Sequence, residues 1–292
     1  MSVISTLKFI VNHPLNRSNK IQAIFRFAKW QILNMISKKT IVYEFTKNSK
    51  LIISRGMTGA TGNYYCGLHE FYDMGFLLHF MRKEDLFVDI GANIGSYTIL
   101  ASAQVGCRTI AVEPVPTTFG CLKNNISLNN IEDKVTALNI ALGSAPGKIS
   151  FTSNLDTMNH VSNNNLENDI VVDVSKLDSI LNDVFPSLIK LDVEGFESEV
   201  INGASQTLLN PTLKAIIIEL NGSGTKFGFD DKDIHHKLLK MDFKPYTYDP
   251  FQRNLSQVES FGVENTIYIR DIDFVFDRVQ SANKIKILNQ EF

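Results

Sequence analysis

Cysteine is scarce in this 292-residue sequence. The three cysteines, Cys66, Cys107 and Cys121, form no CxxC motif, and the six histidines form no HExxH motif. A disulfide framework needs several paired cysteines, and a structural zinc site needs clustered thiolates or imidazoles. We therefore expect neither kind of site and interpret the cysteines as reduced thiols of a cytoplasmic protein.

Long apolar runs are also missing from the sequence. None reaches the roughly 18 residues that a membrane-spanning helix needs. The N-terminus has no short apolar core followed by a small-residue cleavage site, so we predict no secretory signal. The formal net charge of -2 provides no broad positive field, and we expect no nucleic-acid partner.

Positive charge is concentrated at the N-terminus. Residues 1–40 contain seven lysines or arginines and no acidic residue, and the first acid is Glu44. Apolar residues at helical spacing over 21–36 predict an amphipathic helix. We favour packing of its wide apolar face on the catalytic domain or on a second subunit of a homo-oligomer. The alternative is peripheral contact of residues 1–40 with an anionic membrane surface.

Strands and helices alternate after residue 85. This alternation predicts right-handed crossovers and an α/β fold with a doubly wound, mostly parallel sheet. The predicted strands cover 86–90, 109–113, 135–142, 188–193, 214–220, 246–248 and 266–270. The predicted helices between them cover 95–104, 117–129, 197–209 and 231–241.

Two regions before and within this domain have a different composition. Short apolar segments at 41–45 and 51–54 predict a hairpin, and glycines at 56–67 predict a flexible stretch. We therefore divide the chain into an N-terminal extension, residues 1–70, and a catalytic domain, residues 71–292. Residues 153–169 are rich in Asn, Ser and Asp and predict a surface loop.

The sharpest motif is VDIGANIG at 88–95, where a predicted strand gives way to a helix. Ligands of open α/β sheets bind at such strand ends. A dinucleotide requires GxGxxG, whereas the spacing here is GxNxG and follows Asp89. That carboxylate would repel a pyrophosphate but suits the cationic end of S-adenosylmethionine. Glu113, which ends the next strand, suits the ribose of either cofactor, so an NAD-dependent oxidoreductase stays open.

A second acidic motif, KLDVEGFE, occupies 190–197. Asp192 and Glu194 differ by two positions and share one face of an extended strand, which suits substrate binding or proton abstraction. Glu194 and Glu197 could instead favour the N-terminus of the next helix. We predict no bound metal. The alternative to a metal-free site is Mg²⁺ bound by Asp192, Glu219 and Asn221. The histidines His69 and His160 are further candidates for the catalytic base.

These motifs together resemble the FkbM family of S-adenosylmethionine-dependent methyltransferases. The matching segments are DIGANIGSYT at 89–98, VEP at 112–114, NIALG at 139–143, KLDVEGFESEVINGA at 190–204 and IIIEL at 216–220. The resemblance covers residues 70–270. It implies the class I methyltransferase fold, a Rossmann-like sheet of seven strands with the last antiparallel. It also implies methyl transfer to hydroxyls of sugars, polyketides and similar metabolites.

The resemblance also implies roles for individual residues. Asp192 and Glu194 would line the reacting side, and we predict that they are catalytic, as base or in orienting the acceptor. Phe196 departs from the small residue or histidine that the family often has there. The cofactor-binding positions would be Asp89, Gly91, Asn93 and Gly95 for the methionine part, Glu113 for the ribose, Ile140 and Ala141 beside the adenine, with Ala92 and Pro114 adjoining them. We expect O-methylation of a sugar, glycan or secondary metabolite. The alternative is a catalytically inactive binding protein on the same fold.

Overall fold

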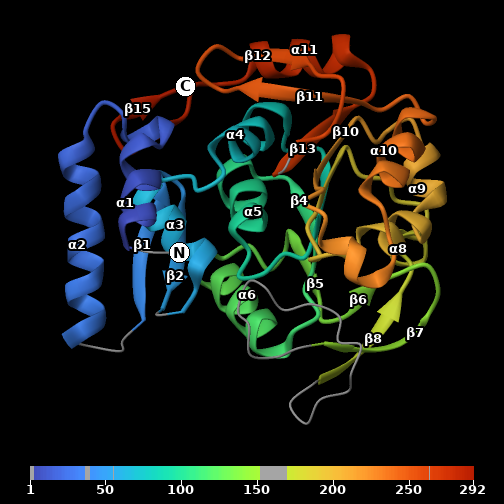
Figure 1. The fold of residues 1–292 in the computed structure, drawn as a ribbon, viewed down its shortest axis with the longest axis horizontal. Coiled ribbons are helices and arrows are strands. Elements are labelled where there is room, and N and C mark those ends of the chain that lie inside the picture. Colours follow the sequence, from blue (N-terminus) through green and yellow to red (C-terminus); the bar gives the residue numbers. More distant parts are fainter. Residues whose placement is uncertain (1–2, 37–39, 55, 152–169, 263) are drawn as a thin grey trace.

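The computed structural model describes residues 3–36, 40–54, 56–151, 170–262 and 264–292. An eight-stranded sheet forms its centre, in the order β12-β11-β13-β10-β9-β3-β4-β5 (Figure 1). The strands are β3 (Leu86–Ile90), β4 (Arg108–Val112), β5 (Val135–Leu138), β9 (Leu188–Leu191), β10 (Ala215–Glu219), β11 (Lys244–Asp249), β12 (Asn254–Gln257) and β13 (Asn265–Ile269).

The sheet has the predicted class I arrangement with one strand added. Strands β3, β4, β5, β9 and β10 pair in parallel, and β13 lies antiparallel between β10 and β11. The additional strand β12 pairs with β11 at the edge. Strand order reverses between β3 and β9, so the ligand crevice that such sheets form is expected at their carboxyl ends.

Helices cover both faces of the sheet (Figure 1). Successive strand residues point to opposite faces, so Phe87 belongs to one buried cluster and Val88 to the other. One layer contains α4 (Phe71–Phe80), α5 (Ser96–Ile99) with the π-helical segment η2 (Leu100–Val105), α6 (Pro116–Leu128) and α11 (Ile272–Ser281). The other contains α7 (Leu177–Leu181), α8 (Glu197–Asn202), α9 (Ser205–Leu209) and α10 (Asp231–Leu239).

Two predicted elements of the catalytic domain are divided in the structure. The strand predicted at 135–142 becomes β5 and β6 (Ala141–Leu142), and β6 joins β7 (Gly147–Phe151) and β8 (Ile170–Ser175) in a separate sheet. The helix predicted at 197–209 is interrupted at Gly203. A Cβ there would lie 2.0 Å from the Gly143 carbonyl oxygen, so this close contact requires glycine. The loop predicted at 153–169 lies outside the described residues.

The N-terminal extension contains α1 (Val3–Asn12), the 3₁₀ turn η1 (Pro14–Asn16), α2 (Lys20–Ile36), β1 (Ile41–Thr46), β2 (Ser49–Ile53) and α3 (Thr58–Cys66). The predicted helix and hairpin are confirmed. The prediction of a flexible stretch at 56–67 is wrong, because α3 forms there. Tertiary packing overrides its glycines, since Ala60 and Tyr65 join Trp30 in one buried cluster.

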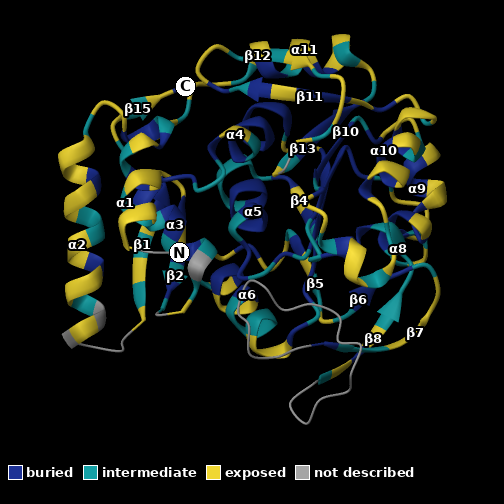
Figure 2. Ribbon diagram, viewed as in Figure 1, coloured by how far each residue is buried: buried dark blue, intermediate teal, exposed yellow. Residues whose placement is uncertain are grey.

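Helix α2 packs through the side opposite to the predicted one. Ala23 and Trp30 are buried, whereas Ile21, Phe25 and Met35 are 82%, 67% and 86% exposed. Figure 2 shows most of α2 as exposed. The prediction that its wide apolar face packs on the catalytic domain is therefore wrong. No helix in the described part of the chain is long and apolar enough to cross a membrane.

Candidate active site

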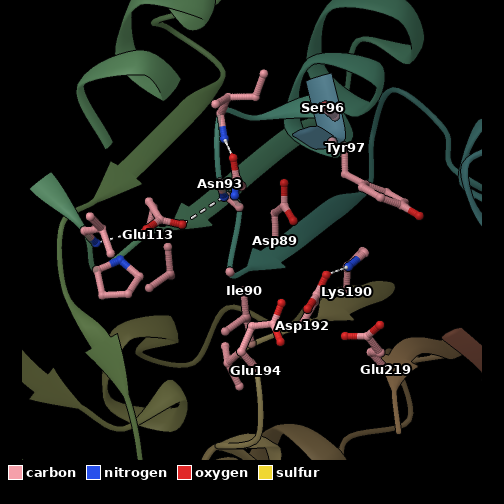
Figure 3. Close-up of a pocket in the computed structure, with 18 of the residues that line it drawn as sticks. Asp89, Ile90, Asn93, Ser96, Tyr97, Glu113, Lys190, Asp192, Glu194 and Glu219 are labelled. Carbon is pink, nitrogen blue, oxygen red and sulfur yellow. Dashed lines mark hydrogen bonds and ion pairs between the residues drawn. The ribbon is translucent and has the colours of Figure 1, made fainter. Parts of the chain in front are cut away.

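A pocket of about 270 Å³ opens at the carboxyl ends of β3, β4, β9 and β10 (Figure 3). We call it the cofactor pocket. Both predicted catalytic residues, Asp192 and Glu194, line it. The predicted cofactor-binding residues in its wall are Asp89, Gly91, Ala92, Asn93, Glu113, Pro114, Ile140 and Ala141. Gly95 does not line the pocket; it immediately precedes α5, has φ +94° and faces Leu122.

The loop between β3 and α5 is built for close backbone approach. Gly91 has φ +77°, and a Cβ at this position would lie 1.7 Å from the Asp192 carbonyl oxygen. Asn93 also has positive φ, at 51°. A left-handed conformation at a residue other than glycine costs free energy, and such residues gather at functional sites. Gly91 and Asn93 therefore shape the pocket wall beside the carboxyl ends of β3 and β9.

Glu113 binds this loop from the end of β4. Its carboxylate accepts hydrogen bonds from the backbone N–H groups of Asn93 and Val115, both at 2.9 Å (Figure 3). Burial raises its pKa to about 7. A carboxylate has about four acceptor positions, so two N–H donors leave capacity for further hydroxyl donors. The arrangement fits the ribose of S-adenosylmethionine.

Asp89 lies at the end of β3 and is 2% exposed. The Thr98 hydroxyl donates a hydrogen bond to its carboxylate at 2.6 Å. Burial raises the pKa of Asp89 to about 6, so the carboxylate is mostly ionised at neutral pH. A negative charge in this wall suits the ammonium and sulfonium groups of S-adenosylmethionine.

Three carboxylates meet on the opposite side of the pocket. Asp192, Glu194 and Glu219, the acidic cluster, have carboxylate oxygens within 4.8 Å of one another (Figure 3). Burial raises the pKa of Glu194 to about 7 and that of Glu219 to about 8, and Asp192 adds to both shifts. Glu194 has φ 55° and precedes Gly195 at φ 105°. The strained turn thus holds a carboxylate that can take up a proton near neutral pH.

Lys190 supplies positive charge to the acidic cluster. Its Nζ lies 2.8 Å from an Asp192 oxygen and 5.0 Å from the centre of the Tyr97 ring. Burial alone would lower the pKa of Lys190, but the negative charges of Asp192 and Glu70 raise it by more than burial lowers it. Lys190 therefore remains charged. The Tyr97 hydroxyl in turn donates to Glu70. These carboxylates could also offer oxygen ligands to a divalent cation, although Lys190 already offsets one of their charges.

Lys190, Tyr97 and Glu70 were not predicted as site residues. Lys190 stands two positions before Asp192 on the same strand face, a signal that could have identified it. Tyr97 and Glu70 give no such signal, because the fold brings them together from separate segments. Ser96 and Asn63 also line the pocket, and the Asn63 amide donates to the Ser96 hydroxyl at 3.0 Å.

The other predicted candidates have different surroundings. Glu197 accepts N–H bonds from Val193 and Gly195, at 3.1 and 3.2 Å, and so stabilises the turn. Asn221 accepts a bond from the N–H of Ser223 and is not part of the acidic cluster. His69 lines the pocket. His160 lies outside the described residues.

The sheet order, the glycine loop and the carboxylate at the end of β4 together define a class I methyltransferase. The Methyltransferase FkbM domain profile matches residues 89–245, more than half of the chain, and the chain belongs to this family. It is 28% identical over 208 residues to hexuronic acid methyltransferase AglP of Haloferax volcanii, covering 70% of this chain and 75% of that protein.

Two further proteins are similar to this chain. The chain is 27% identical over 162 residues to methyltransferase sdnD of Sordaria araneosa, covering 43% of this chain and 62% of that protein. The solved structure of precorrin-6y C5,15-methyltransferase from Geobacter metallireducens has a TM-score of 0.41 at 13% identity, covering 70% and 89% of the two chains. Family membership makes this protein an S-adenosylmethionine-dependent methyltransferase. The comparisons give no support to the NAD-dependent alternative.

Proposed function

We propose that this methyltransferase acts on a hydroxyl oxygen of a sugar or glycan, with a hexuronic acid unit as the first candidate. The named activity of AglP supports the sugar class. The acidic cluster beside the cofactor pocket is the observation that carries the choice of a hydroxyl. S-adenosylmethionine supplies an electrophilic methyl group, and a sugar hydroxyl is too weak an acid to react without losing its proton.

Glu194 is the base in this proposal. Its pKa of about 7 lies near the expected working pH, where a base is most effective. The proton of the acceptor hydroxyl passes to the Glu194 carboxylate and then to water. Asp192, held by Lys190, accepts a hydrogen bond from the acceptor and orients it. The cofactor contacts follow the loop of residues 89–95, Glu113 and the segment near Ile140.

The product distinguishes this proposal from its alternatives. The protein is incubated with methyl-labelled S-adenosylmethionine and one candidate acceptor at a time. The acceptors are glucuronides, the matching neutral glucosides and hydroxylated polyketides. We expect label on a sugar as an ether stable to mild alkali, located by NMR. A methyl ester, which alkali cleaves, would contradict the need for a base, because a carboxylate is already ionised. Binding of S-adenosylmethionine without transfer to any compound would favour the inactive binding protein.

We also propose that α2 lies on an anionic membrane surface at the cytoplasmic side. The apolar face of α2, formed by Ile21, Ile24, Phe25, Ile32 and Met35, is exposed along the helix. Lysine and arginine side chains lie in the same extension, which has no acidic residue before Glu44. An apolar face combined with basic residues is typical of helices that bind anionic lipid headgroups. Each nearby lysine or arginine contributes about 1 kcal/mol to such binding.

Vesicle sedimentation tests this contact. We expect the intact protein to sediment with vesicles of phosphatidylglycerol and phosphatidylcholine at low salt and to be released at high salt, because screening weakens the attraction. Serine at Ile21, Phe25 and Met35 should abolish sedimentation, since the apolar contact is lost.

The control variant carries serine at Val171, Leu209 and Phe276, which are also exposed but lie outside the extension. It should sediment like the wild type. A dimer in solution that the α2 variant dissociates, without vesicle binding by the wild type, would assign the apolar face to a second subunit instead. A monomer that never sediments would also refute the membrane proposal.

A further inference from the structure

A second cavity, of about 540 Å³, adjoins the cofactor pocket. It lies between the α1–η1 segment and the start of α4, and the first residues of β13 close it. His69, Glu70 and Glu219 line both cavities. The second cavity therefore adjoins the reacting side of the cofactor pocket at these three residues.

Aromatic side chains and carboxylates line the second cavity, and the carboxylates are those of Glu70, Asp73, Glu219 and Glu264. Phe9 and Tyr72 are 42% and 47% exposed, and the Phe9 ring centre lies 5.1 Å from that of His69. His13 is buried, which lowers its pKa to about 4 and keeps the ring uncharged. Its Nδ1 accepts the Leu15 N–H, so Nε2 carries the proton and donates to the His69 carbonyl at 3.2 Å. This bond joins α1–η1 to the segment before α4.

Polar atoms without partners lie in the residues of this lining. The His69 Nδ1 and Asn265 Oδ1 atoms are buried, and neither has a hydrogen-bond partner among the described residues. Asp73, which the Asn265 amide contacts at 3.4 Å, has its pKa raised to about 7 by burial and by Glu70. Both atoms are fully covered by protein, and His69 Nδ1 packs against Gly62, so the acceptors that a ligand with hydroxyl groups would meet are the carboxylates of the lining.

The rim of the second cavity carries two cations. Lys8 and Arg17 come from the α1–η1 side, and both are exposed. Neither forms an ion pair within the ranges that the structure describes. An unpaired lysine and an unpaired arginine at the mouth of a cavity suit an anionic group on the ligand, and the guanidinium can bind a carboxylate through two hydrogen bonds.

We infer that the second cavity is the acceptor site and that it takes a sugar ring with a carboxylate substituent. Phe9 and Tyr72 pack on the ring, the carboxylates of Asp73 and Glu264 accept hydrogen bonds from its hydroxyls, and Lys8 and Arg17 bind its carboxylate. The inference rests on the proposed function, since it locates the acceptor of the same reaction. It also assigns a binding role to the N-terminal extension, which the methyltransferase domain match at 89–245 does not include.

Binding of two matched glycosides tests the site. Methyl glucuronide and methyl glucoside differ in the C6 carboxylate, and saturation-transfer NMR in the presence of S-adenosylhomocysteine measures their binding. We expect wild type to bind the glucuronide about tenfold more tightly than the glucoside. Alanine at both Lys8 and Arg17 should remove this preference, while S-adenosylmethionine affinity, measured by calorimetry, stays unchanged.

Lys20 and Lys29 provide the matched control. Both are exposed cations of the same extension and line neither cavity, so their double alanine variant should keep the preference. Equal binding of both glycosides by wild type, or binding of neither, would refute a carboxylate-binding site. A preference that survives loss of Lys8 and Arg17 would place the acceptor elsewhere. Methylation of a sugar that is unaffected by this variant would leave the proposed function intact and refute only the site.

Discussion

Glutamine in place of Glu194 is expected to lower the rate of methyl transfer by about 100-fold or more. The substitution keeps the shape of the side chain but removes the carboxylate that accepts the proton. Affinity for S-adenosylmethionine should stay near that of wild type, because the proposed cofactor contacts lie on other residues. Single-turnover rates with the acceptor that the labelling experiment identifies, together with calorimetric titration of the cofactor, measure the two effects separately.

The pH dependence of the rate provides a second measurement on the same variant. Burial raises the pKa of Glu194 to about 7, and the base is active only when ionised. The wild-type rate should therefore rise with pH as Glu194 loses its proton near pH 7 and level off above it. Glu194→Gln should lose this rise, because amide groups do not titrate.

Glu199→Gln is the matched control for Glu194→Gln. Glu199 lies in α8, accepts a hydrogen bond from the Ser144 hydroxyl and does not line the cofactor pocket, so its variant should transfer methyl at nearly the wild-type rate. A rate within a few-fold of wild type for Glu194→Gln would exclude Glu194 as the base. A large loss in Glu219→Gln would then assign the role to Glu219. Activity that is lost on dialysis against a chelator and restored by Mg²⁺ would assign the acidic cluster to a metal.

The cofactor pocket could be predicted from the sequence because its determinants are local. A strand end, two glycines and an acid occur within residues 88–95, and parallel strands bring their carboxyl ends to one edge. Glu113 and Asp192 follow from the same rule applied to β4 and β9. Gly95 shows the limit of a motif, since its positive φ serves the start of α5 rather than the pocket wall.

Tertiary packing determines the features that the sequence did not predict. Residues 56–67 contain several glycines, yet α3 forms because its neighbours bury it. Helical spacing identifies α2 but does not show which side is covered, and the structure buries Ala23 and Trp30 on the side opposite to the wide apolar face. The second cavity combines His13, His69 and Asn265 from three distant segments, and no local pattern connects them.

Glu113→Ala is expected to weaken S-adenosylmethionine binding by about 1–3 kcal/mol, or about 5- to 150-fold in Kd. The change removes the buried carboxylate that we assign to the ribose hydroxyls. Calorimetric titration measures the affinity. Glu132→Ala, at an exposed glutamate outside the pocket, should bind like wild type.

The Glu113 side chain also accepts the Asn93 and Val115 N–H bonds, so a weaker affinity could arise from a disturbed loop. A thermodynamic cycle separates the two causes. It combines Glu113→Ala in the protein with removal of the ribose 2′-hydroxyl from the ligand, in 2′-deoxy-S-adenosylhomocysteine. Wild type should bind S-adenosylhomocysteine more tightly than the deoxy compound, because only the former offers both hydroxyls. Glu113→Ala should bind the two compounds about equally. If the variant still discriminates as strongly as wild type, or if its affinity is unchanged, Glu113 does not bind the ribose and its carboxylate serves the loop alone.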